Sequence, residues 1–262
     1  MAEHVDKIVV IIKSTIGPLR SSGYITISFS ACALFVLVKI LVGQALNVYW
    51  YAVLHAILTG PPALLCMYLD SHASRIDPGS SPEPLRSIKG AQALTPLHSL
   101  VPMISLGYGL VDLVEGIYLK RYDYVIHGLS MLASMGSCCF LGKSHLVTPA
   151  LIMELSSVPL NFLDCTIENE LFKIVIQITF VLSFFFTRLI IVPWLWFNFV
   201  KTYYRHVVVG GNKSSFPGWF IYIVVGLGLV FHSLNAYWFS YVLQKAGDAI
   251  GGGGAGAGEK EL

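Results

Sequence analysis

The chain has 262 residues, of which 55% are hydrophobic and only 12% are charged, and its mean hydropathy is +0.69. Soluble domains carry about 25% charged residues, so this chain has too little charge to cover a water-facing surface, and a soluble globular enzyme is excluded. The aromatic fraction of 13% excludes disorder, and the net charge of +2 argues against nucleic-acid binding. The composition therefore predicts an integral membrane protein.

Seven mainly apolar stretches are each close to the roughly 20 residues that a helix needs to cross a bilayer core. In chain order they are residues 25–43, 48–69, 97–117, 123–141, 145–163, 172–199 and 217–243. The fourth and fifth stretches are the least apolar and are joined by Gly142-Lys143-Ser144, so we expect a tight helical hairpin there. The pattern predicts an all-α fold, a multi-pass transmembrane helical bundle with six or seven spans.

The segments outside these stretches are short. Residues 3–16 alternate charged residues with Val and Ile at helical spacing, which suits a helix on the membrane surface or an ordinary flank. Residues 70–96 contain a cluster of Pro, Gly and Ser and are expected to form a loop. Residues 251–258, GGGGAGAG, are typical of a flexible tail. We therefore divide the chain into 1–45 (surface helix and first span), 46–245 (main membrane domain) and 246–262 (Gly-rich tail).

Two ionisable residues lie near the middle of predicted spans, Arg188 in the sixth and Glu154 in the fifth. A charge at the centre of a membrane helix costs on the order of 2.5–3.5 kcal/mol on insertion scales, so such residues usually face a cavity or a partner. Arg188 is always protonated and needs an anion or water. We expect the two to pair, either as an ion pair that fixes helix packing or as the lining of a polar cavity that holds a lipid head group or a thioester.

The fifth stretch has a polar face. Glu154, Ser157 and Asn161 lie at i, i+3 and i+7, which places them on one side of an α-helix. Pro149 and Pro159 bracket this face, and the irregular backbone that proline causes is tolerated in membranes only where protein or water covers it. The fifth stretch is therefore predicted to form the wall of a cavity.

Histidines and carboxylates occupy other spans. Asp123 and His127 are four residues apart in the fourth stretch, so the carboxylate could orient the imidazole; the alternative is an interfacial Asp123 and a core His127. His55, His232 and Asp112 lie in the second, seventh and third stretches, where they either pack in the core or line the cavity. No phosphate loop, nucleophile elbow, C-x-x-C or H-E-x-x-H motif occurs, so neither a cofactor nor a metal site is predicted.

Five polar motifs resemble, in this order, those of the TLC domain, which is named for translocation-associated membrane proteins, longevity-assurance ceramide synthases and a ceroid lipofuscinosis protein. The motifs are YWYAVLHAIL at 49–58, SLGYGLVDLV at 105–114, YDYVIHGLSML at 122–132, LIMELSSVPLNF at 151–162 and FFFTRLIIVPW at 184–194. The resemblance covers residues 46–245, which it identifies as a TLC domain.

The resemblance implies a core of six helices, with one span before it, around a lipid-accessible cavity in the endoplasmic reticulum or a related endomembrane. Membrane lipids are the implied partners. The ceramide synthases of the family join the acyl group of acyl-CoA to a sphingoid base and carry two adjacent histidines, whereas this chain has His127-Gly128. The resemblance therefore implies a non-synthase member that acts in membrane lipid homeostasis.

The alternative is a ceramide-synthase-like N-acyltransferase, with acyl-CoA as a further partner. In that case His127 would be the acyl acceptor or general base and Asp123 would orient it. Arg188 and Glu154 would supply the charges of the cavity.

Overall fold

The computed structural model describes residues 21–43, 45, 48–76, 95–141, 143–163, 165–166 and 168–250. The predicted surface helix at 3–16, most of the predicted loop and the tail at 251–258 lie outside these residues. The described part of the chain is helical, with α-, 3₁₀- and π-helical elements. These are α2 (Ser21–Val42), α3 (Trp50–Ile76), α5 (Leu97–Leu119), α6 (Tyr122–Phe140), η2 (Ser144–Leu146), η3 (Thr148–Ser156), α7 (Ser157–Leu160), α8 (Glu170–Phe184), η4 (Phe185–Ile191), α9 (Val192–Tyr203), η5 (Tyr204–Val209) and α10 (Gly218–Ile250).

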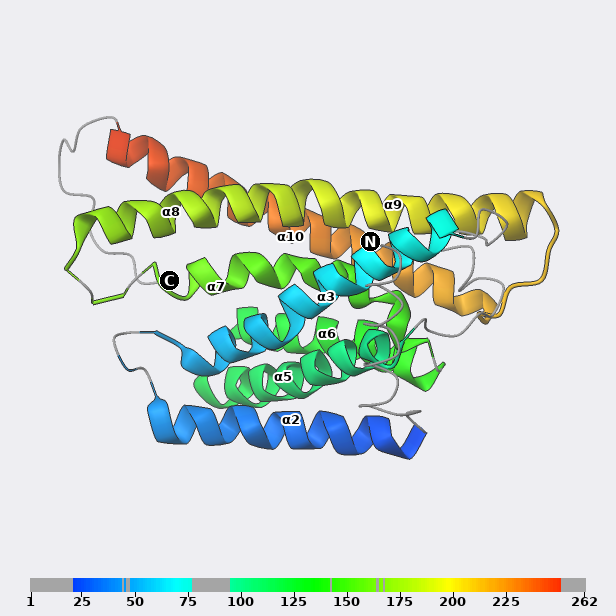
Figure 1. Ribbon diagram of the computed structural model, residues 1–262, viewed down its shortest axis with the longest axis horizontal. Helices are drawn as coiled ribbons and strands as arrows, with labels where there is room; N and C mark the ends of the chain where they lie inside the picture. The colour runs from blue at the N-terminus through cyan, green and yellow to red at the C-terminus, as the bar shows by residue number, and fades with distance from the viewer. Residues whose placement is uncertain are drawn as a thin grey trace.

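The helices run roughly along the long axis of the molecule (Figure 1). Helix α2 lies at one edge, and the continuous helix formed by α8 and α9 lies at the opposite edge. The segment η3–α7 runs between them, and η3 packs against α3, α5, α8, α9 and η4. The middle of the bundle is therefore built around η3.

Five stretches of the described chain are long and apolar enough to cross a membrane, namely Ile25–Val42, Trp50–Ser71, Leu97–Leu119, Glu170–Val209 and Gly218–Gln244. They correspond to five of the seven predicted stretches, and the predicted all-α multi-pass membrane bundle is confirmed. The fourth predicted stretch forms a single helix, α6, which carries Asp123 and His127 and is not among these five spans.

The fifth predicted stretch, 145–163, does not form a long α-helix. It folds as η2, the nine-residue 3₁₀-helix η3 and the short helix α7. The 3₁₀ conformation rarely persists beyond three or four residues. Pro149 lies in the first turn of η3, where proline is tolerated, whereas Pro159 in α7 cannot donate an N–H to a continuing α-helical ladder. The predicted helical hairpin is replaced by a tighter, irregular segment.

The sixth stretch is longer than predicted, because α8, η4, α9 and η5 follow one another without a break over 40 residues. At 1.5 Å per residue this is about 60 Å, roughly twice the hydrocarbon core, so part of it extends beyond the core. In its π-helical segment η4 the N–H of Val192 bonds to the carbonyl of Thr187, five residues back. Pro193 has no N–H. The backbone carbonyl of Arg188 therefore receives a helical hydrogen bond neither from Val192 nor from Pro193.

Helices α5 and α6 approach each other closely at Gly128. A Cβ atom at this position would lie 2.7 Å from the carbonyl oxygen of Gly109 and 2.7 Å from the backbone nitrogen of Leu113. Both obstructing atoms belong to the backbone of α5, so a side chain cannot be accommodated by a change of rotamer. The distance between α5 and α6 therefore depends on a glycine at position 128.

We predict that Gly128→Ala destabilises the protein by about 1–3 kcal/mol, the usual effect of overpacking. Gly136→Ala is the matched control in the same helix, because a Cβ atom there meets nothing within 4 Å. The control should be neutral or stabilising by up to about 1 kcal/mol, since alanine favours helix more than glycine does. Thermal unfolding in detergent measures both, and equal stability of the two variants would contradict the close contact.

Candidate functional site

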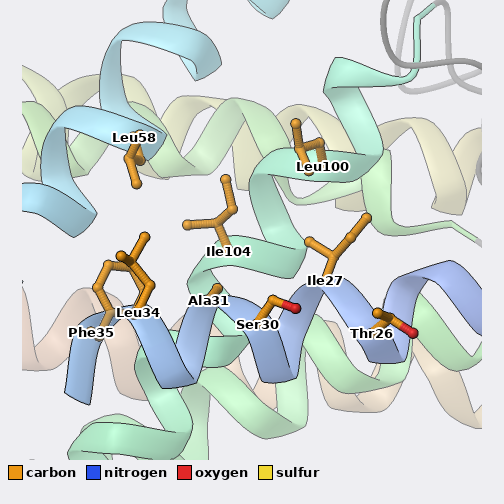
Figure 2. A pocket seen from close by; sticks show the side chains of 9 residues that line it. All are labelled: Thr26, Ile27, Ser30, Ala31, Leu34, Phe35, Leu58, Leu100 and Ile104. Atoms are coloured by element: carbon orange, nitrogen blue, oxygen red, sulfur yellow. The ribbon is translucent and has the colours of Figure 1, made fainter. Parts of the chain in front are cut away.

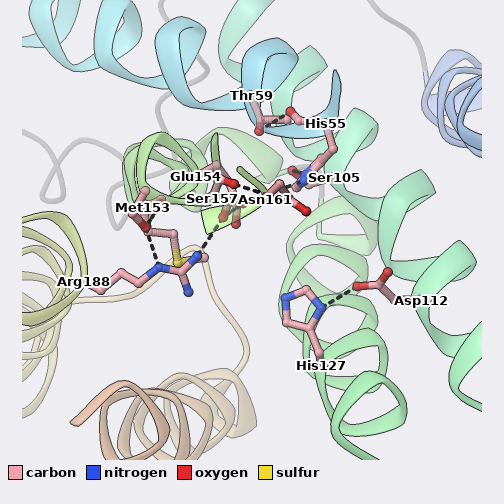
Figure 3. Close-up of polar contacts among 11 residues, drawn as sticks. His55, Thr59, Ser105, Asp112, His127, Met153, Glu154, Ser157, Asn161 and Arg188 are labelled. Carbon is pink, nitrogen blue, oxygen red and sulfur yellow. Dashed lines mark hydrogen bonds and ion pairs between the residues drawn. The ribbon is translucent and has the colours of Figure 1, made fainter. Parts of the chain in front are cut away.

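A chain of buried polar side chains begins at Arg188 in η4, whose side chain points into the bundle (Figure 3). Its guanidinium donates from Nε to the Ser156 hydroxyl at 2.8 Å and from Nη2 to the Ser157 hydroxyl at 2.9 Å. Ser157 donates in turn to a carboxylate oxygen of Glu154 at 2.7 Å. Arg188 and Glu154 are 8% and 4% exposed. The expected pairing of Arg188 with Glu154 is therefore indirect, because a serine hydroxyl stands between the two charges.

The 3₁₀ conformation of η3 explains why this link forms. With three residues per turn, side chains three apart in sequence are eclipsed, which places Glu154 directly beside Ser157. Ser156 donates its own hydroxyl proton to the carbonyl of Met153, at 2.7 Å. With its proton engaged in this bond, the hydroxyl oxygen of Ser156 is free to accept from the guanidinium of Arg188.

The polar chain continues from Glu154 into α3 and α5. Nδ1 of His55 lies 3.8 Å from a Glu154 carboxylate oxygen, and Nε2 of the same ring lies 3.1 Å from the hydroxyl of Ser105. His55 is 1% exposed. Thr59 donates to the backbone carbonyl of His55 at 2.7 Å. The histidine therefore connects the carboxylate of η3 with α5.

The second polar group of the interior is formed by His127 of α6 and Asp112 of α5. Nδ1 of His127 lies 2.7 Å from a carboxylate oxygen of Asp112 (Figure 3). Asp123, which the sequence suggested as the orienting carboxylate, instead forms a 2.7 Å ion pair with Arg121. Asp123 is exposed at the start of α6, whereas Asp112 is buried. The partner of His127 is thus corrected to Asp112.

Aromatic rings connect the two polar groups. The ring of Tyr108 stacks on the ring of His55, with centroids 4.0 Å apart and an interplanar angle of 4°. Its centroid also lies 6.4 Å from that of His127. Phe35 of α2 meets both His55 and Tyr108 edge-on and is fully buried. The polar chain and the His127–Asp112 pair therefore line one site.

The last two predicted residues lie at the margin of this site. Asn161 follows α7, and its amide donates to the carbonyl of Ser157 at 2.7 Å, so it closes the end of that helix. His232 of α10 lies beside Trp196, with ring centroids 5.2 Å apart. Both of its ring nitrogens are buried and have no hydrogen-bond partner among the described residues.

Sequence reasoning missed several residues of the site. Ser105 and Tyr108 precede Asp112 by seven and four residues, so they share its helix face, and that spacing could have identified them. A separate buried cluster joins α3 to α5. There His98 lies 2.9 Å from the Thr95 hydroxyl through Nδ1 and 3.3 Å from the Asp70 carboxylate through Nε2. The separation of Asp70 from His98 in sequence gave no signal of their contact.

The site offers two kinds of chemistry. Arg188 provides a fixed positive charge with several N–H donors, which can bind a phosphate or carbonyl group. His127 is held by Asp112 through one ring nitrogen, which leaves the other nitrogen to exchange a proton, and 30% of its side chain is exposed. Within the described residues, no group of three or more His, Cys, Asp and Glu side chains could hold a metal ion.

An apolar groove of about 300 Å³ lies between α2, α3 and α5 (Figure 2). Leu34, Leu58 and Ile104 are among the side chains that line it, and so is Phe35. Because Phe35 also contacts His55 and Tyr108, its ring separates the groove from the polar site. The groove itself contains none of the predicted site residues.

Comparison with known proteins gives one match. The family model described as the TLC domain matches residues 47–244, which include every predicted site residue. No curated protein and no solved structure shows a significant match.

We predict that Asp112→Asn, but not Asp123→Asn, changes the protonation and tautomer of the His127 ring. Of these two carboxylates, Asp112 is the one within hydrogen-bond distance of that ring, and a carboxylate at this distance fixes which nitrogen carries the proton. ¹⁵N NMR of histidine-labelled protein in detergent measures the effect, with His127→Ala used to assign the signal. A response to Asp123→Asn alone would overturn the corrected pairing.

We predict that Ser157→Ala lowers the free energy of unfolding by about 1.5–3 kcal/mol, because it removes hydrogen bonds to two buried charges. Arg188→Leu and Glu154→Leu should each lower it by about 3–5 kcal/mol, since each strands an opposite charge. Ser134→Ala is the control, because that hydroxyl bonds to backbone carbonyls of its own helix.

Unfolding of each variant in detergent measures these free energies of unfolding. In the double variant of Arg188 and Glu154 the loss should be smaller than the sum of the two single losses. Wild-type stability of both single variants would show that the two charges are not linked.

Proposed function

Because this chain is a multi-pass membrane protein that belongs to the TLC domain family, we propose that it binds the polar head of a membrane lipid inside its helical bundle. Through this binding it acts in membrane lipid homeostasis. Its partners are membrane lipids, among which sphingolipids are the first candidates because the family includes ceramide synthases. Its proposed location is the endoplasmic reticulum or a related endomembrane.

The observation that supports this proposal is the polar chain from Arg188 to His55. These groups lie within or between segments that are apolar enough to cross a membrane, where ionisable residues are rare and usually functional. A direct ion pair would place the guanidinium on the carboxylate and neutralise its charge. Here the guanidinium contacts two neutral hydroxyls instead, which leaves its charge able to interact with a phosphate or carbonyl group of a lipid.

The second candidate function is acyl transfer to an amine, and the His127–Asp112 pair favours it. The carboxylate would orient the imidazole, and the second ring nitrogen would take the proton of the attacking amine or accept the acyl group. The packing of α6 argues against a close copy of the synthase site. A side chain at position 128 would meet the backbone of α5, so a second histidine there would disrupt the contact that holds His127 against Asp112.

The deciding experiment is purification of the protein with native lipid, followed by mass spectrometry of the lipids that remain bound. The same preparation is then incubated with an acyl-CoA and a sphingoid base, with His127→Ala and, as control, His206→Ala from η5. We expect a retained lipid without turnover, and less retained lipid in Arg188→Leu than in wild type.

Two results would change the conclusion. An N-acyl product or a covalent acyl adduct that is lost in His127→Ala but kept in His206→Ala would establish the acyltransferase instead. A wild-type protein that retains no lipid at all would contradict the proposed lipid binding.

A further inference from the structure

Helix α10 presents two polar side chains to the interior that have no hydrogen-bond partner among the described residues. Asn235 is 0% exposed, and neither its amide oxygen nor its amide nitrogen is bonded. His232 precedes it by three residues, and both ring nitrogens are buried and unbonded. Buried polar groups are nearly always hydrogen-bonded in folded proteins, so four such atoms on one helix face need partners that the described residues do not supply.

The neighbours of Asn235 show which part of the bundle it faces. Phe231, Asn235 and Phe239 follow at four-residue intervals and form one stripe on α10. Phe239 stacks on Phe184, with centroids 5.9 Å apart and an interplanar angle of 11°. Phe231 packs against the core cluster that includes Val192. His232 lies beside Trp196, with ring centroids 5.2 Å apart, so the contacts of Phe239 with Phe184 and of His232 with Trp196 flank η4 on the facing helix, the segment that carries the guanidinium of the polar chain.

Asn235 is thus the polar residue in an otherwise aromatic stripe, at the level of Arg188. Helix α10 packs against η4, α9 and α6, and α6 carries His127. The unbonded amide therefore lies on a helix that packs against both η4, which carries Arg188, and α6, which carries His127. Neither polar group uses it, because the hydrogen bonds of Arg188 and of His127 are made to residues outside α10.

We propose that Asn235 and His232 form a hydrogen-bonding subsite for the hydroxyl or amide group of a lipid that is held beside Arg188. A carboxamide both donates and accepts, and so does a neutral imidazole. A hydroxyl or amide group of the ligand also donates and accepts, so it can bond to a donor and to an acceptor of these side chains at once. A phosphate only accepts and would leave the Asn235 oxygen unpaired. This inference rests on the proposed function and adds the class of lipid, one with an uncharged hydrogen-bonding group in its head region.

The proposed subsite leads to two predictions for Asn235→Leu, a higher stability without lipid and a lower affinity for lipid. Without lipid, the unfolding temperature of the variant should be about 2–4 °C higher than that of wild type, because the substitution removes buried polar atoms without partners. The same variant should bind N-oleoylethanolamine, which carries an amide and a hydroxyl, about tenfold more weakly. Methyl oleate has the same acyl chain without a donor, and both proteins should bind it equally weakly.

The experiment measures thermal unfolding and equilibrium binding in detergent for the delipidated full-length protein. Ser233→Leu is the matched control on the exposed face of α10 and should change neither quantity. His232→Phe is the second variant, which keeps a ring and removes both nitrogens. His232→Phe should also raise the stability of the lipid-free protein and weaken the binding of N-oleoylethanolamine, so it serves as the test if Asn235→Leu does not fold.

The following results would overturn the proposal. Lower stability of both lipid-free variants would show that the two side chains have structural partners. Unchanged binding of N-oleoylethanolamine would show that the subsite serves no ligand. If wild type retains native lipid but does not prefer N-oleoylethanolamine to methyl oleate, the subsite fails and the proposed function stands. If wild type binds no lipid in either experiment, both fail.

Discussion

The buried guanidinium of Arg188 is the constraint on which the interior of this bundle depends. It lies in a continuous 40-residue apolar helix, where lipid offers no hydrogen bonds and the charge cannot be removed. Its partners are the hydroxyls of Ser156 and Ser157, so η3 must pass next to η4. The 3₁₀ conformation of η3 and the π conformation of η4 are the two departures from regular helix that bring these groups together.

The contact between α5 and α6 sets the second polar group. Gly128 lets the two backbones approach, and this approach allows Asp112 to reach the ring of His127. The same closeness leaves no room for a side chain beside His127. One packing requirement therefore both positions the histidine and separates this chain from a site that needs two adjacent histidines, which is why membership of the family does not by itself settle the chemistry.

The polar interior is divided between residues that satisfy one another and residues that do not. Glu154, His55 and Asp112 all have protein partners, whereas Asn235 and His232 have none among the described residues. Well-satisfied networks make a membrane bundle rigid, and unsatisfied buried groups reduce its stability. The interior of this bundle contains both kinds of group, the satisfied ones on α3, α5 and η3 and the unsatisfied ones on α10.

The sequence by itself determined the class of fold, because a low charge content and long apolar runs permit only a membrane helical bundle. It also identified Arg188, Glu154, His55, His127 and Asp112 as polar groups, since any ionisable residue in an apolar run is conspicuous. Only the tertiary structure decided their partners. Asp123 follows the helical spacing that suggests a contact with His127, yet the orienting carboxylate comes from α5. The 3₁₀ segment was likewise hidden, because its i to i+3 pattern resembles an α-helix and its conformation depends on the helices that pack around it. Spacing along the chain fixes only local neighbours, whereas the partner of a buried charge is set by whichever helix packs against it.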